Sequence, residues 1–333
     1  MNIFFICFLI TLTSFFVSYI YQSFASKKKI LASINFRTLH AKETPKGGGI
    51  VLSSVFMISI SIMIYLEILK DDVLLLVSLC SVLSSFVGFL DDLYDLKAAI
   101  KIVVQLAMAI SILILIFPIY YLNSLYLLSA LLLLCIFIVW VINSVNFMDG
   151  IDGLCSSIAI CILTSASFGL HLSGYGFHYY LPFLITLSIC IGFLIVNLSS
   201  KKLFMGDSGS LFLGYLLCFF ALRSIMEGHL SFWFWSILFS FILTETTSTT
   251  IYRLFNLDNW HGAHRSHAYQ NLARVLDNHK AVTGGVVAYH FFWLAPLSIA
   301  SIVFSYFSLI YLILAILPVL VFNLKYGPRF SNS

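Results

Sequence analysis

The chain has 333 residues, of which 61% are hydrophobic and only 10% are charged. A water-soluble globular protein carries roughly a quarter charged residues, so this composition excludes that class and indicates a protein embedded in a lipid bilayer. The formal net charge is +4, and no basic patch interleaved with aromatic residues predicts a nucleic-acid partner.

Apolar runs long enough to cross a bilayer recur along the whole chain. A transmembrane helix needs about 20 apolar residues to span about 30 Å of hydrocarbon. The sequence contains 11 such runs, and the short gap between the last two also allows one broken segment. They lie near 2–22, 47–66, 73–90, 99–117, 124–143, 154–171, 180–198, 209–226, 231–252, 283–303 and 305–324. We therefore expect an all-α, polytopic integral membrane protein with about 11 transmembrane helices.

The basic residues indicate how these helices are oriented. Three lysines at 27–29 follow the first run and no basic residue precedes it. This order is the reverse of a cleavable signal peptide, so we expect a retained helix with a periplasmic N-terminus. Alternating the loops from there places 16 of the 18 basic residues inside and only Lys70 and Arg223 outside, as the positive-inside rule requires. The same alternation predicts a cytoplasmic C-terminus.

We expect a single membrane domain over 1–333, because no inverted repeat, low-complexity tract or soluble domain is evident. Its seven cysteines fall in or beside apolar runs without C-x-x-C spacing, so they predict neither a zinc site nor a disulfide framework. The cytoplasmic loops that would carry the chemistry lie near 23–46, 91–98, 144–153, 199–208 and 253–282.

Six acidic residues stand at predicted helix ends on the cytoplasmic side, in three separate loops. They are Asp91, Asp92, Asp95, Asp149, Asp152 and Asp207. Carboxylates brought together repel one another, and a bound divalent metal would remove that repulsion. Oxygen-only ligands favour Mg²⁺, with Mn²⁺ as an alternative.

Glycine-rich turns accompany the acidic residues, and Asp207 directly precedes a predicted helix. A helix N-terminus favours phosphate, because it offers free N–H groups and a partial positive charge. A simpler interpretation is that Asp207 and Ser208 are N-cap residues and nothing more. The segment 40–49 adds Lys42, Lys46 and three glycines. It belongs either to the same anion site or to an interfacial turn.

The longest cytoplasmic loop, 253–282, contains His261, His264 and His267, spaced three residues apart, and Arg265 lies between the last two of these three. The spacing admits a zinc site, but the absence of cysteine from the loop and the acidic clusters elsewhere favour phosphate or leaving-group contacts. A polar loop without a ligand is the third interpretation. Glu245, within the ninth apolar run, is an ionisable group in a membrane helix, which indicates a function that the sequence leaves open.

Three motifs together resemble a known superfamily. Residues 89–96 read F-L-D-D-L-Y-D-L, 143–154 read N-x-x-N-x-x-D-G-x-D-G-L, and 204–210 read F-M-G-D-x-G-S. In order and spacing, from about residue 37 to 280, the chain resembles the polyprenyl-phosphate N-acetylhexosamine-1-phosphate transferases of glycosyltransferase family 4. Its segments 44–49 and 263–270 look most like the branch that initiates bacterial O-antigen synthesis.

The resemblance implies roles for individual residues. Asp207 would ligate Mg²⁺, Asp91 and Asp92 would flank the metal and the lipid phosphate, and His267 would belong to the family's histidine motif. Phe204 would stack on the uracil. The residues that the resemblance implies to line the nucleotide-sugar pocket are Asn146, Asp149, Asp152, Asn197 and Phe204. Lys42 joins this set from the anion-site interpretation of segment 40–49, and the loop pattern leads us to expect phosphate contacts from His264 and Arg265.

The implied reaction transfers a sugar 1-phosphate of the N-acetylhexosamine type from a UDP-sugar to undecaprenyl phosphate and releases UMP. The resemblance implies that it takes place in the bacterial inner membrane, at an active site that faces the cytoplasm. The alternative is the peptidoglycan enzyme phospho-N-acetylmuramoyl-pentapeptide transferase, whose three consecutive histidines are here replaced by His-Arg-Ser-His at 264–267. A secondary transporter, an alternative of another class, would place ionisable groups near the bilayer midplane. The sequence leaves open the sugar, the pathway, a homodimeric state, and whether Asp91 is a base or an orienting residue.

Overall fold

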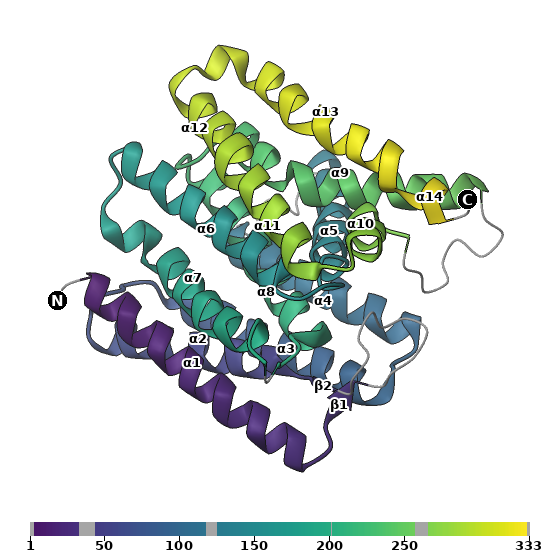
Figure 1. Ribbon diagram of the computed structural model, residues 1–333. Helices are drawn as coiled ribbons and strands as arrows, with labels where there is room; N and C mark the ends of the chain where they lie inside the picture. The colour runs from purple at the N-terminus through teal and green to yellow at the C-terminus, as the bar shows by residue number, and fades with distance from the viewer. Residues whose placement is uncertain (1–2, 33–43, 118–124, 201, 257–265, 332–333) are drawn as a thin grey trace.

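The computed structural model describes residues 3–32, 44–117, 125–200, 202–256 and 266–331, which form a bundle of long helices (Figure 1). A short antiparallel strand pair, with Leu31 opposite Pro45, precedes the second helix. The elements in chain order are α1 (Ile3–Lys27), β1 (Leu31–Ala32), β2 (Thr44–Pro45), α2 (Gly48–Tyr65), α3 (Asp72–Tyr94), α4 (Ala98–Ile116), α5 (Leu125–Asn146), α6 (Leu154–Leu172), α7 (Phe177–Asn197), α8 (Gly206–Met226), α9 (Phe232–Asn256), α10 (Ala268–Leu276), α11 (His279–Tyr289), a π-helical turn (His290–Leu294), α12 (Ala295–Val303), a 3₁₀ turn (Ser305–Phe307), α13 (Ser308–Tyr326) and α14 (Pro328–Ser331).

Each apolar run of the sequence forms a helix close to its predicted bounds. Within the described ranges, ten helices are long and apolar enough to cross a membrane. The run predicted at 231–252 forms α9 but is not among the ten, because its polar stretch around Glu245 lowers its hydropathy. The last two runs form two stretches, His279–Val303 and Ser305–Tyr326, rather than one broken segment. The chain is therefore an all-α, multi-pass membrane protein.

Helix α8 lies at the centre of the bundle and packs against α2, α3, α4 and α5 (Figure 1). Large side chains on it, including Phe212, Tyr215 and Phe219, are fully buried. A helix that is apolar on all sides is stable only when it is enclosed by other helices or by lipid. The neighbouring helices therefore fix the position of the α8 N-terminus, where Asp207 lies.

The outer helices of the bundle present apolar side chains to their surroundings. Helix α1 packs on α2 and α7, and α13 packs on α9. Phe4 on α1 is 83% exposed and Leu324 on α13 is 73% exposed. Such a surface is unfavourable in water, but in a bilayer it faces hydrocarbon. The lipid-exposed surface thus agrees with the class that the composition predicts.

Glycines allow the closest helix crossings at one end of the bundle. A Cβ added at Gly49 of α2 would lie 2.0 Å from the amide nitrogen of Gly209, and one added at Gly88 of α3 would lie 2.5 Å from the carbonyl oxygen of Asp207. Small residues let helix backbones approach in a membrane. They bring α2 and α3 directly against the first turn of α8.

Candidate active site

The carboxylate of Asp92 faces the N-terminus of α8. Its two oxygens accept hydrogen bonds from the backbone N–H groups of Asp207 at 3.3 Å and Ser208 at 3.4 Å. Gly206 precedes them with φ of +69°, and a Cβ there would lie 2.3 Å from Asp92 Oδ2. The positive end of the helix dipole stabilises a carboxylate at this position. Asp92 therefore ties the end of α3 to the start of α8.

Asp91 and Asp207 meet next to this junction, and their carboxyl groups lie within hydrogen-bonding contact of each other. The ammonium of Lys101, from the first turns of α4, lies 2.6 Å from Asp91 Oδ2 and 3.8 Å from Asp207 Oδ2. The backbone N–H of Leu96 also donates to Asp91 Oδ1 at 2.8 Å. Because like charges repel, Lys101 stabilises this pair of carboxylates.

The donor set of this pair fits a hard divalent cation. Among the residues that the structure describes, no group of three or more histidine, cysteine, aspartate or glutamate side chains is arranged to hold a metal ion. Mg²⁺ usually takes only one or two carboxylates from the protein and completes its octahedron with water and substrate phosphate. Asp91 and Asp207 match this requirement.

A small cavity lies beside these carboxylates, and Asn146 lines it together with them. Its walls include Asp91, Lys101, Gln105, Asn146 and Asp207. The hydroxyl of Ser210 donates to Asn146 Oδ1 at 2.8 Å. The last residue of α5 is thereby joined to α8, and an amide side chain lies at the edge of the carboxylate pair.

Asp149 lies in the turn between α5 and α6, next to the same junction. The backbone N–H of Gly206 hydrogen bonds to its carboxyl group. Burial and the nearby Asp92 raise the pKa of Asp149 well above its usual range, although the Gly206 hydrogen bond opposes this rise and Asp152 adds to it. The raised pKa favours the protonated form of Asp149, which limits the repulsion between this carboxyl group and Asp92 at the start of α8.

Asp152 occupies a second polar centre. It is 5% exposed and forms an ion pair with Lys202, while the ring of His279 lies 3.4 Å from its Oδ2. Its backbone carbonyl accepts a hydrogen bond from the Thr283 hydroxyl at 2.9 Å. Asp152 thus links the α5–α6 turn to the α7–α8 loop and to α11.

Asn197 and Phe204 shape the α7–α8 loop. Asn197 Nδ2 donates to the Leu203 carbonyl at 2.8 Å, and its buried Oδ1 accepts no hydrogen bond from the part of the chain that the structure describes. The N–H of Phe204 donates to the Pro45 carbonyl at 2.8 Å, and that of Gly48 donates to the Phe204 carbonyl at 3.0 Å. The triple glycine therefore joins the strand pair to this loop.

His267 lies at the start of α10, where Glu245 of α9 holds it. Glu245 Oε2 lies 2.8 Å from His267 Nδ1, and its Oε1 accepts the N–H of Ala268 at 2.9 Å. Both side chains are buried. The His267 ring lies 5.4 Å from that of Phe147, whose carbonyl accepts a hydrogen bond from the Tyr269 hydroxyl. Glu245 therefore orients His267 toward the α5–α6 turn.

The structure brings Asp91, Asp92, Asn146, Asp149 and Asp207 together. Asp152 and Phe204 lie on the surrounding loops at the same end of the bundle, Asn197 is the last residue of α7, and His267 directly precedes α10. Lys42, His264 and Arg265 lie outside the described residues, so their predicted contacts remain predictions.

Three further residues contact the candidate site but were not selected from the sequence. They are Lys101, Lys202 and His279. Each is a basic residue at the start of a helix or in a loop, close in the sequence to an acidic motif or to a predicted cytoplasmic loop. That position is the signal by which the sequence could have identified them.

The sequence model of glycosyl transferase family 4 matches residues 74–225. The chain is 28% identical over 248 residues to the probable undecaprenyl-phosphate N-acetylglucosaminyl 1-phosphate transferase of Bacillus subtilis, which covers 71% of this chain and 67% of that protein. It is 28% identical over 216 residues to the decaprenyl-phosphate N-acetylglucosaminephosphotransferase of Mycobacterium leprae, with coverage of 58% and 54%. It is 32% identical over 203 residues to the phospho-N-acetylmuramoyl-pentapeptide-transferase of Petrotoga mobilis, with coverage of 55% and 62%.

The fold and these matches define a polytopic membrane enzyme of the phosphosugar-transferase class. The chain is similar to glycosyl transferase family 4 over residues 74–225, which is less than half of its length. The matches span between 54% and 67% of these three relatives' own length.

Proposed function

We propose that this chain transfers an N-acetylhexosamine 1-phosphate from a UDP-sugar to undecaprenyl phosphate and releases UMP. The observation that carries the proposal is the contact between Asp91 and Asp207 at the N-terminus of α8, with Asn146 in the wall of the adjacent cavity. The names of the relatives favour N-acetylglucosamine as the sugar. The resemblance at 44–49 and 263–270 favours the first step of O-antigen synthesis.

In this reaction an oxygen of the lipid phosphate attacks the β-phosphorus of the UDP-sugar. The bond from that phosphorus to the UMP oxygen breaks, and UMP leaves with the bonding electrons. Phosphoryl transfer requires little covalent work from the protein, so positioning and charge stabilisation dominate. The partial positive charge at the start of α8 and the ammonium of Lys101 are placed to stabilise the diphosphate.

Asp91 and Asp207 would hold Mg²⁺, which when bound neutralises negative charge on the diphosphate. We assign Asp91 an orienting role rather than that of a general base. It is already engaged by Lys101 and by the Leu96 N–H, and these contacts stabilise its charged form. The second pKa of a phosphate monoester is about 6, so the lipid acceptor is mostly ionised at neutral pH without a base.

The nucleoside would bind at the second polar centre. Asp152, held by Lys202 and near His279, would accept a hydrogen bond from the uracil. Phe204 would stack on the base, and the buried Oδ1 of Asn197 would accept a hydrogen bond from the donor. His267, oriented by Glu245, would contact the leaving phosphate from the α10 side.

We further propose that the site faces the cytoplasm from the inner membrane. The prenyl tail must stay in hydrocarbon while its phosphate meets a soluble nucleotide, which requires an interfacial site. Lys101 and Lys202 lie at the end of the bundle that carries the acidic residues, whereas Lys70 and Arg223 lie at the other end. This distribution follows the positive-inside rule.

The test is a radiolabel transfer assay with purified full-length protein, Mg²⁺, undecaprenyl phosphate and a panel of UDP-sugars. We expect chloroform-soluble product with UDP-N-acetylglucosamine and its loss when EDTA is added. Product with UDP-N-acetylmuramoyl-pentapeptide alone would instead establish the peptidoglycan reaction. Absence of lipid-linked product across the panel would overturn the proposed function.

A further inference from the structure

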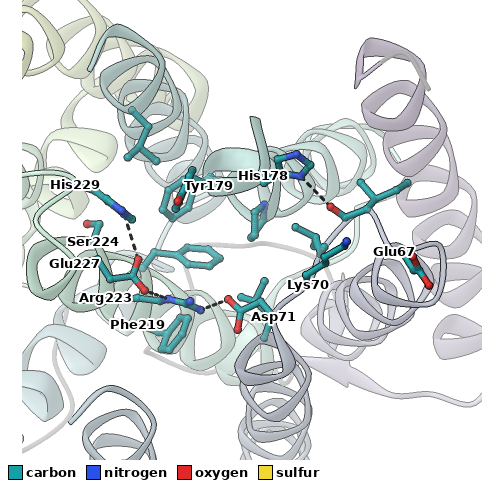
Figure 2. Close-up of a pocket in the computed structure, with 17 residues that line it drawn as sticks. Glu67, Lys70, Asp71, His178, Tyr179, Phe219, Arg223, Ser224, Glu227 and His229 are labelled. Carbon is teal, nitrogen blue, oxygen red and sulfur yellow. Dashed lines mark hydrogen bonds and ion pairs between the residues drawn. The ribbon is translucent and has the colours of Figure 1, made fainter. Parts of the chain in front are cut away.

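A second cavity lies at the opposite ends of α3 and α8 from the carboxylates. Its volume is about 820 Å³, and it is enclosed by the α2–α3 loop, the start of α7 and the end of α8 (Figure 2). Asp207 and Arg223 are separated by 16 helical residues, or roughly 24 Å at 1.5 Å per residue. The cavity is therefore separate from the candidate active site.

The rim of this cavity carries charges of both signs. Arg223 lies between two carboxylates, at 2.5 Å from Asp71 and 2.8 Å from Glu227, as Figure 2 shows. The ring of His229 lies 3.2 Å from Glu227. Counting also Glu67 and Lys70, the lining holds three carboxylates and two fixed cations. This balance does not favour a simple anion, because the carboxylates would repel it.

Two of these charged groups are available to a ligand. In the described part of the chain, neither Lys70 nor Glu67 forms an ion pair, and both side chains are exposed. Arg223 and His178 lie on facing sides of the cavity (Figure 2). A phosphate can thus reach fixed cations, and an ammonium can reach carboxylates, within one cavity.

The floor of the cavity is apolar. It includes Leu74, Leu170, Phe183 and Phe220, all buried in the bundle. An apolar floor under a charged rim is complementary to an amphiphile, and a volume of this size holds a ligand of several hundred daltons. The cavity also lies where the spanning helices end, at the level at which lipid headgroups begin.

We propose that this cavity binds the headgroup of a phospholipid that carries a phosphate and a primary ammonium, as in phosphatidylethanolamine. The phosphate would contact Lys70 and Arg223, and the ammonium would donate hydrogen bonds to Glu227. A primary ammonium fits better than a quaternary one, because carboxylates need N–H donors to form charge-assisted hydrogen bonds. The first carbons of the acyl chains would cover the apolar floor.

A bound headgroup would bridge the α2–α3 loop to the end of α8, adding to the ion pair between Asp71 and Arg223. It would thereby hold together the far ends of the two helices whose other ends carry Asp91 and Asp207. The lipid site does not depend on the transferase activity, because it shares none of the residues assigned to that reaction.

Native mass spectrometry of the purified full-length protein tests the proposal. The protein is supplied with equal amounts of phosphatidylethanolamine, phosphatidylcholine and phosphatidylglycerol. We expect the ethanolamine lipid to be retained at least fivefold more than either of the others. Equal retention of the three lipids, or preference for the choline or glycerol lipid, would overturn the proposal.

Two variants locate the binding to this cavity. Glu227→Gln is expected to reduce the preference for the ethanolamine lipid to less than twofold. Lys70→Gln removes a phosphate contact that the three lipids share, so it is expected to lower the retention of the ethanolamine lipid at least threefold. The matched control is Asp72→Asn, because Asp72 is an exposed carboxylate next to Asp71 that does not line the cavity. Full preference in Glu227→Gln, or undiminished retention in Lys70→Gln, would contradict the site. Lys70 is exposed and outside the helices, so its variant tests the site even if Glu227→Gln fails to fold.

Discussion

The two ends of α3 and α8 carry similar residue types in different balances. At one end Asp91, Asp92 and Asp207 gather near Lys101, and Lys46 lies close enough to Asp92 to act on it electrostatically. At the other end Arg223 lies between two carboxylates. The first end keeps an excess of negative charge that a cation would relieve. At the second end the charges are closer to balance, with three carboxylates against two fixed cations. A large excess of one charge that the fold holds in place indicates chemistry, whereas nearly balanced charge indicates a structural or zwitterionic contact.

The largest expected effect comes from removing charge at the acidic end. Asp207→Asn should lower the transfer rate by about 10²–10³-fold, the usual cost of losing a preorganised electrostatic contact. Initial rates with saturating UDP-sugar measure this effect. The control is Asp72→Asn, an exposed carboxylate at the other end of α3, which should retain the wild-type rate. An Asp207→Asn rate above one tenth of wild type would contradict the charge-excess interpretation.

The packing at the two ends can be compared at two glycines that have similar backbone conformations. Gly206 has φ of +69° and Gly228 has φ of +71°, but an added Cβ meets Asp92 only at Gly206, and at Gly228 it meets nothing within 4 Å. Gly228→Ala should cost about 1–2 kcal/mol for the left-handed backbone alone. Gly206→Ala should cost about 1–3 kcal/mol more for the close contact. The midpoints of SDS-induced unfolding measure both, and equal losses would show that the α3–α8 junction tolerates a side chain.

The contact between Glu245 and His267 predicts an intermediate effect. Glu245→Gln keeps an acceptor for the Ala268 N–H but can place an amide donor against His267 Nδ1, which changes the preferred tautomer. We expect about a tenfold lower rate and an altered pH–rate profile. A correctly positioned proton donor or acceptor commonly contributes more than about tenfold to the rate of an enzyme. Thr247→Ser on the same helix is the control. An unchanged rate and profile would mean that Glu245 serves only as a cap for α10.

The smallest effect concerns pH and Asp149. Burial and Asp92 raise the pKa of Asp149, so the folded protein holds a proton that the unfolded chain has released above about pH 3.9. Stability should therefore fall as the pH rises from there through the raised pKa. Asp149→Asn should reduce this fall. Unfolding midpoints measured in EDTA between pH 4 and 8 test the prediction, and an identical pH dependence in the variant and wild type would contradict it.

The helices were predictable because the bilayer imposes a strong constraint on length and hydropathy. The run at 231–252 shows the limit of that signal, since α9 is helical although its polar stretch keeps it out of the apolar set. Helix α10 and the strand pair were not predicted, because short elements outside the membrane lack a strong periodic signal. The side of the membrane on which each terminus lies remains a prediction from the sequence.

The sequence was enough to predict most residues of the candidate site, but not which of them contact one another. Asp91 and Asp92 are adjacent in sequence, and only the structure shows that Asp92 faces the start of α8 while Asp91 faces Lys101. Neighbours on a helix point about 100° apart, so a motif does not assign their separate roles. Likewise, Glu245 and His267 are 22 residues apart, and no local pattern pairs them.

The central claim is that Asp91 and Asp207 form the cation site for the UDP-sugar diphosphate. Electron paramagnetic resonance of Mn²⁺ with purified protein and UDP tests it directly. We predict protein-bound Mn²⁺ in the wild type and in Asp72→Asn, and its loss in both Asp91→Asn and Asp207→Asn. Unchanged Mn²⁺ binding in either carboxylate variant of the pair would contradict the claim.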